Sequence, residues 1–125
     1  MSQTDFDGTE LYHKVRELIA WVYALEDRFP DSEIPILYTR LKGAAVDLGS
    51  SVAEGLARDG IVADGTLSPQ ARRESRGRLG VVRHLVLVSA SQFMLDEGHV
   101  SSFDRMYEPL RDALAPREGD APGDL

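Results

Sequence analysis

The chain has 125 residues, the usual size of a single domain with one hydrophobic core. It contains no cysteine, which excludes disulfides, thiolate metal sites and a catalytic thiol and makes the cytoplasm the simplest expectation. The formal net charge of -7 argues against a protein whose whole surface attracts nucleic-acid phosphates. No stretch approaches the roughly 18 apolar residues of a membrane span, and residues 1–8, which we expect to be disordered, are polar and unlike a signal peptide.

The first predicted helix covers residues 9–28. Apolar side chains recur at alternating spacings of four and three from Leu11 to Phe29, the pattern of a helix-bundle seam. Thr9 is a possible N-cap, and Pro30 ends the helix because proline lacks the backbone donor.

A second helix is predicted for residues 35–58, with Pro35 in its opening turn. Small side chains let a neighbouring helix approach closely, and each interior glycine costs about 1 kcal/mol in helix propensity unless packing compensates. The middle of this helix is rich in such residues, namely Gly43, Ala44, Ala45, Gly49, Ser50, Ser51 and Ala53.

Residues 59–67 read as a loop because of their Asp and Gly content, with a short hairpin as the alternative. A third helix follows over residues 68–97, with Ser68 as its N-cap, Pro69 at its first position and Gly98 as its stop. Its second half is apolar around most of its circumference, which is typical of a helix buried on more than one side. One of its faces carries Val82, Leu85, Val86, Ser89 and Phe93.

The fourth helix is expected to begin at a Ser101 or Ser102 cap and to reach Leu114, with Pro109 bending or interrupting it. Residues 115–125 form an acidic tail that we expect to be disordered. Four helices joined by short connections predict an all-α fold, an up-and-down antiparallel four-helix bundle over residues 9–114.

Basic residues are concentrated at the start of the third predicted helix. Several guanidinium groups on one helix could meet a phosphate backbone or an acidic protein patch, although a solvated helix face is the simpler interpretation. Of the five arginines in this segment, the first, third and fifth share a helical face and the other two lie beside it: Arg72, Arg73, Arg76, Arg78 and Arg83.

No constellation of residues predicts catalysis. A di-metal bundle needs two Glu-x-x-His motifs, and the chain has one, Glu10 to His13, so the possible ligands His13, Glu17, Asp47, Glu54 and His84 are an incomplete set. Ser50 and Ser51 with His84 do not form a nucleophile motif, and the serines read as packing residues. We therefore expect no cofactor, no metal and no enzymatic activity.

Trp21 and Tyr23 lie off the seam of the first helix. Together with the largely apolar third helix they indicate more apolar surface than four helices can hide, which favours a homo-oligomer.

The second predicted helix also resembles a known family. Residues 37–60 are similar to the most recognisable segment of the 23S ribosomal RNA intervening-sequence proteins, where a hydrophobic-x-x-Gln-Leu-x-x-Ala-Ala run leads to hydrophobic-Ala-Glu-Gly. The matching positions here are Leu41, Ala44, Ala45, Val52, Ala53, Glu54 and Gly55. The first helix, ending in Arg28, Phe29 and Pro30, resembles that family's first helix, and the order and spacing are similar over residues 11–95.

The resemblance implies an up-and-down four-helix bundle, often a homopentamer, without known catalytic residues. A related branch, the accessory variability proteins of diversity-generating retroelements, is basic and binds a reverse transcriptase and RNA, whereas this chain is acidic. We therefore expect a non-enzymatic oligomeric adaptor that docks a protein or nucleoprotein partner and has no membrane contact. The alternative is an RNA-binding accessory factor that uses the arginine cluster.

Overall fold

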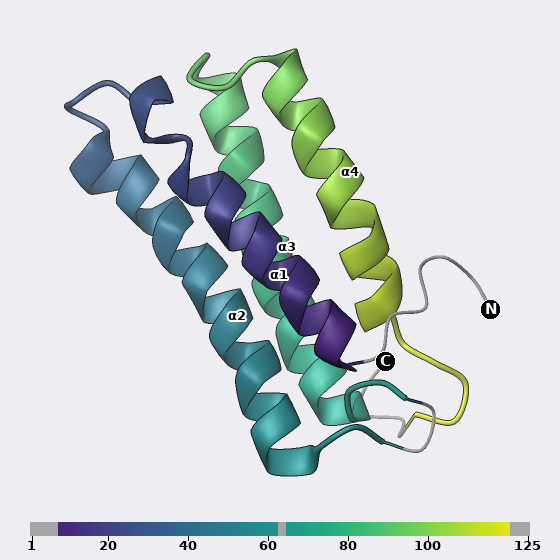
Figure 1. Cartoon of the computed structure of the whole chain (residues 1–125). Coiled ribbons are helices and arrows are strands. Elements are labelled where there is room, and N and C mark those ends of the chain that lie inside the picture. Colours follow the sequence, from purple (N-terminus) through teal and green to yellow (C-terminus); the bar gives the residue numbers. More distant parts are fainter. Residues whose placement is uncertain (1–7, 63–64, 121–125) are drawn as a thin grey trace.

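The computed structural model describes residues 8–62 and 65–120. Its four main helices are α1 (Gly8–Tyr23), α2 (Thr39–Asp59), α3 (Pro69–Ser91) and α4 (Glu97–Leu114). They run antiparallel in sequence order, and each packs on the next, with α1 also contacting α4 (Figure 1). The predicted all-α four-helix bundle is confirmed, and the described part of the chain contains no strand.

The end of α1 is set by a tertiary contact rather than by Pro30. The seam residues from Leu11 to Phe29 are buried as predicted, but the α-helix stops at Tyr23 and continues as a 3-10 turn, η1 (Glu26–Arg28). The buried Tyr38 hydroxyl donates to the carbonyl oxygens of Val22 (3.0 Å) and Tyr23 (2.8 Å). These acceptors lie in the last turn of α1, where the Val22 carbonyl oxygen also accepts the Leu25 N–H at 3.1 Å.

Pro35 lies in a π-helical turn, η2 (Ile34–Tyr38), which leads directly into α2. Further along α2, two of its glycines mark close helix contacts. A Cβ added to Gly49 would lie 2.8 Å from Ile19 Cδ1 of α1, and one added to Gly55 would lie 2.5 Å from Ala71 Cβ of α3. The small middle of α2 therefore allows close packing against both of its neighbours.

The connection between α2 and α3 is a loop held at both ends. Gly60 ends α2 with a φ of 67°, and the side chain of Ser68 caps α3 by accepting from the Ala71 N–H. Ser68 Oγ also donates to Asp59 Oδ2 at 2.7 Å, so the last residue of one helix is bonded to the cap of the next. The hairpin alternative falls partly on residues 63–64, which lie outside the described residues.

The predicted boundary between the third and fourth helices is wrong. The third helix ends at Ser91 rather than Glu97, and Phe93 has a φ of 63°. The fourth helix begins at Glu97, capped by Asp96, whose carboxylate accepts the His99 N–H while His99 Nδ1 accepts the Asp96 N–H. This reciprocal pair supplies the cap that we assigned to the later serines.

Proline does not interrupt the last helix, because α4 passes through Pro109 to Leu114. Residues 115–120 also have a described course, and Asp120 reaches back to Arg72 of α3, which differs from the disorder expected there. The rest of the predicted disordered tail, residues 121–125, and residues 1–7 lie outside the described part. No helix within the described ranges is long and apolar enough to cross a membrane.

Candidate functional site

The five arginines of α3 do not form one surface. Three of them face α4 and the residues after it, where they bind within the chain. The first, Arg72, has an exposed fraction of 2%. Its Nη1 donates to the Leu67 carbonyl oxygen at 3.2 Å, its Nη2 pairs with the Asp120 carboxylate, and its Nε has no hydrogen-bond partner among the described residues. Arg72 is therefore a structural residue and offers no accessible guanidinium.

The Arg72 pair has an electrostatic consequence for Asp120. Hydrogen bonds from the Arg117 backbone N–H and from the Arg72 guanidinium lower the pKa of the Asp120 carboxyl. The carboxylate is thus kept ionised beside a buried cation, which would be costly to bury without a counter-charge.

Arg76 and Arg83 occupy the same α4-facing side of α3. Arg76 Nη1 donates to the Leu114 carbonyl oxygen at 2.7 Å and so binds the C-terminal end of α4, where carbonyls lack helical partners. Arg83 lies over the Tyr107 ring, 5.5 Å from its centroid, and Arg111 lies 5.9 Å from the same ring. Arg76 and Arg83 thus hold α3 against α4.

Arg73 and Arg78 are exposed and line a groove between α2 and α3. The groove comprises two adjoining pockets of about 240 and 640 Å³, which share Asp47, Arg78 and Val81. We call it the α2–α3 groove; its lining residues are Arg40, Gly43, Ala44, Asp47, Ser50, Ser51 and Glu54 of α2, and Arg73, Glu74, Gly77, Arg78, Val81 and Leu85 of α3.

Charges of both signs line the α2–α3 groove. Arg40 stands at one end, Asp47 and Arg78 in the middle, and Glu54, Arg73 and Glu74 towards the other end. Arg40, Asp47 and Arg78 make no hydrogen bond or ion pair with the described residues, whereas Glu54 lies 3.9 Å from Arg58. The groove therefore contains charges that the fold itself does not pair.

Glycines keep the groove open, although the packing of the bundle does not require them. A Cβ added to Gly43, Gly77 or Gly80 would meet nothing within 4 Å, in contrast to Gly49 and Gly55. Each exposed glycine in a helix interior still costs about 1 kcal/mol relative to alanine. Gly43 and Gly77 line the groove from opposite helices, and Gly80 lies outside it.

The residues considered for chemistry are dispersed. Asp47 and Glu54 line the groove from α2, while His13 and Glu17 lie exposed on α1 and His84 is exposed on α3 outside the groove lining. Within the described ranges no three His, Cys, Asp or Glu side chains gather as metal ligands do. Ser51 Oγ lies 2.9 Å from Ser75 Oγ, so this serine joins α2 to α3 as a packing residue would.

The residues that carried the family resemblance divide between the core and the groove. Leu41, Ala44, Ala45, Val52 and Gly55 are buried, Ala53 is partly buried and Glu54 is exposed. Buried small residues of this kind explain the close contacts of α2. Comparison with protein-family models, with curated proteins and with solved structures finds no match to this chain.

Sequence reasoning missed the groove as a site, although it singled out its small residues. The pattern of glycines was visible, but their role depends on whether a neighbouring atom stands opposite each one. Gly49 and Gly55 face atoms of α1 and α3, whereas Gly43 and Gly77 face open space. No helical periodicity distinguishes these two cases.

Proposed function

We propose that this protein is a non-enzymatic oligomeric adaptor whose copies join through the α2–α3 groove and whose remaining faces dock a protein partner. The observation that carries the proposal is the groove itself, with open glycines on both walls and unpaired charges along its floor. Open glycines let a helix of another molecule come close to the backbone.

The occupant we propose for the groove is a second copy of the same chain. A two-fold axis across the middle of the groove would place Arg40 of one copy over the far end of the other copy's groove, where Glu54 and Glu74 outnumber Arg73. The same axis would bring Asp47 of each copy towards Arg78 of the other. The groove is thus self-complementary in charge, as an isologous interface requires.

A ring of five, which the resemblance to the 23S ribosomal RNA intervening-sequence proteins implies, would instead place a different face of the next copy in the groove. Solution mass distinguishes these assemblies, because one chain has a mass of 13.8 kDa. We expect light scattering at low and high salt to give a multiple of that mass, and a monomer at both salt concentrations would refute the assembly.

The sharper test is a matched pair of substitutions on α3. Gly77→Gln would fill the groove, whereas Gly80→Gln adds the same side chain to the same helix outside it. We expect the first variant to be a folded monomer and the second to keep the mass of the wild type. Equal masses for the two variants would exclude the groove as the interface.

RNA binding is the competing function, and the structure leaves it less support. Arg72 is buried, Arg76 and Arg83 contact α4, and Arg73 and Arg78 lie beside the acidic residues of the groove. Binding of single-stranded RNA that falls steeply with salt and is lost in the Arg73→Glu and Arg78→Glu double variant would favour it over the adaptor.

A further inference from the structure

Phe93, in the connection between α3 and α4, is a side chain that the fold does not use. Its exposed fraction is 94%, the highest among the large hydrophobic residues that the structure describes as exposed. An aromatic ring stabilises a fold when it is removed from water, and this ring remains in water. It also takes no part in the ring contacts found among the described residues.

The backbone at Phe93 makes the exposed ring harder to explain. The Phe93 N–H donates to the Ala90 carbonyl oxygen and the Met94 N–H donates to the Ser89 carbonyl oxygen, both at 3.0 Å. These two bonds and the φ of 63° define a helix ending that favours glycine, because a Cβ in the left-handed region is strained. The chain thus holds a bulky residue in a strained position and gains no packing from it.

The end of the bundle that carries Phe93 is rich in acidic residues. The α1–α2 and α3–α4 connections lie at the same end of the bundle (Figure 1). We call this the acidic end. Its acidic residues outnumber the single Arg28, and they are Glu26, Asp27, Asp31 and Glu33 in the first connection and Asp96 and Glu97 in the second.

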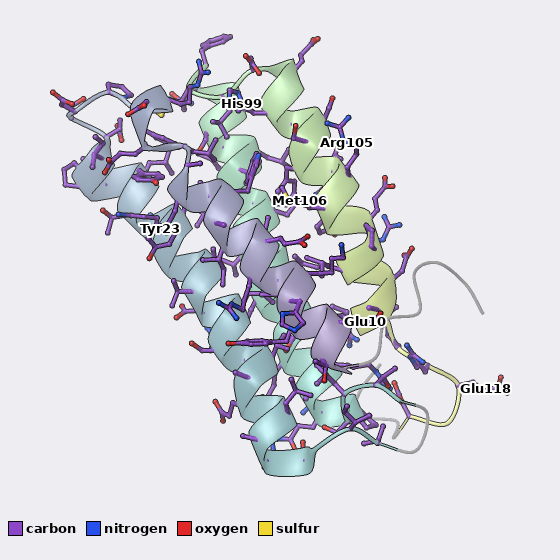
Figure 2. All side chains as sticks on the ribbon, in the orientation of Figure 1. Glu10, Tyr23, His99, Arg105, Met106 and Glu118 are labelled. Atoms are coloured by element: carbon purple, nitrogen blue, oxygen red, sulfur yellow. The ribbon has the colours of Figure 1, made fainter. Side chains whose placement is uncertain are left out.

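Few cationic side chains lie at this end besides Arg28. His99 lies at the start of α4 (Figure 2), where its Nδ1 accepts the Asp96 N–H as part of the helix cap. Lys42, in the first turn of α2, lies over the rings of Tyr23 and Tyr38, 5.6 and 4.8 Å from their centroids. The exposed acids of the end are therefore available to a cationic partner.

Two further apolar side chains are exposed at the same end of the bundle. Ile36, in the turn before α2, is 58% exposed, and Tyr23, the last residue of α1, is 52% exposed. An aromatic anchor with apolar neighbours and a charged rim is the composition of a protein-docking surface.

We propose that Phe93 anchors a basic amphipathic helix of a partner protein at the acidic end. The acids would attract its lysines and arginines, and the ring would enter its apolar face. An anionic membrane or a nucleic acid would be repelled by the same acids, and a second copy would present a like-charged end. This proposal names the partner of the adaptor and rests on that function, but not on assembly through the groove.

The probe is a fluorescently labelled helical peptide of leucine and lysine at helical spacing, with a leucine–glutamate peptide of the same pattern as its control. Anisotropy is measured with the wild-type chain and with Phe93→Gly, which removes the ring and restores the favoured residue. Ile61→Ser serves as the matched control, because Ile61 is 49% exposed in the α2–α3 connection, at the opposite end of the bundle. The thermal midpoint of each variant is measured in parallel.

We expect the wild type to bind the lysine peptide and not the glutamate peptide, with affinity that falls as salt rises. Phe93→Gly should bind roughly tenfold to a hundredfold more weakly while its thermal midpoint rises, and Ile61→Ser should bind as the wild type does. Such opposite changes in binding and stability separate a docking residue from a structural one.

Three results would overturn the proposal. They are equal binding by Phe93→Gly and wild type, no binding of the lysine peptide by the wild type, and Phe93-dependent binding to vesicles of phosphatidylserine and phosphatidylcholine. Assembly is tested separately, because the Gly77→Gln variant should keep its affinity for the peptide. If peptide binding does not depend on Phe93 while the chain still assembles through the groove, the docking surface is refuted and the assembly is not.

Discussion

Alanine at Gly55 tests the closest approach between α2 and α3. The added Cβ would lie 2.5 Å from Ala71 Cβ and 3.7 Å from Ala71 Cα. Ordinary carbon contacts are about 3.5–4.0 Å, so the two helices would have to move apart by about 1 Å. The opposing atom is attached directly to the α3 backbone and cannot turn away as the end of a long side chain could.

The expected size of the effect combines two opposing terms. Overpacking of a core costs about 1–3 kcal/mol, and a rigid neighbour places this site in the upper part of that range. Alanine recovers up to about 1 kcal/mol through its better helix propensity. Gly55→Ala should therefore destabilise the fold by about 1–2 kcal/mol, whereas Gly77→Ala, with open space around its Cβ, should stabilise it by up to about 1 kcal/mol.

Urea unfolding followed by far-ultraviolet circular dichroism measures both variants. With a slope of about 1.5 kcal/mol per molar urea, their midpoints should differ by roughly 1.5 M. Ala71→Gly in the Gly55→Ala background should recover part of the loss, because it removes the opposing carbon, and a double-mutant cycle gives the coupling. Equal stability of the two single variants, or zero coupling, would refute the described contact.

Four further substitutions test three other contacts. Tyr38→Phe removes the hydroxyl that binds two carbonyls at the end of α1 and should cost about 1–2 kcal/mol in urea unfolding. Hydrogen bonds from Arg58 and Ser68 lower the pKa of Asp59 to about 2. The ionised carboxylate therefore stabilises the fold at pH values above the usual pKa of 3.8, and this stabilisation is lost as the pH falls towards 2. Asp59→Asn should flatten that part of the curve of urea midpoint against pH. Asp120→Ala should destabilise the fold because it leaves the buried Arg72 without its carboxylate. Arg72→Met should be nearly neutral in the same urea assay, but protease should then cleave residues 115–120 faster.

Helical periodicity predicted the elements well, because it reports which side chains can share one buried face. The seam from Leu11 to Phe29 is buried in the structure as the spacing indicated. The ends of the helices were less predictable, because they depend on atoms far away in the sequence. The Tyr38 hydroxyl donates to carbonyl oxygens at the end of α1, fifteen and sixteen residues earlier in the chain, and no local sequence pattern predicts this contact.

The boundary between α3 and α4 shows a second limit. Apolar residues continue past Ser91, so the spacing alone extended the third helix to Gly98. The helix instead ends at Ser91, just before the left-handed Phe93, and ordinary helix-stop rules do not recognise phenylalanine as a stop. The pairing of Asp96 with His99 was the available signal, since Asp is a favoured cap, but His replaces the usual Glu or Gln of a capping box.

The arginines of α3 illustrate what periodicity predicts about a site and what it omits. It placed Arg72, Arg76 and Arg83 on one face, and the structure has all three on the side facing α4 and its C-terminal extension. Which neighbour covers that face depends on the packing of the whole bundle. Arg73 and Arg78, which lie beside the predicted face, line the α2–α3 groove instead.

The groove and the acidic end share one physical property: each lowers the stability of the isolated chain at positions where a simple substitution would raise it. Gly43 and Gly77 each cost about 1 kcal/mol of helix propensity without a packing gain, and Phe93 adds the strain of a left-handed non-glycine residue. These costs are a substantial part of a net stability of about 5–15 kcal/mol. Contacts that exist only in a complex would offset them, and for that reason the substitutions that most stabilise the free chain should be the ones that weaken its assembly and its docking.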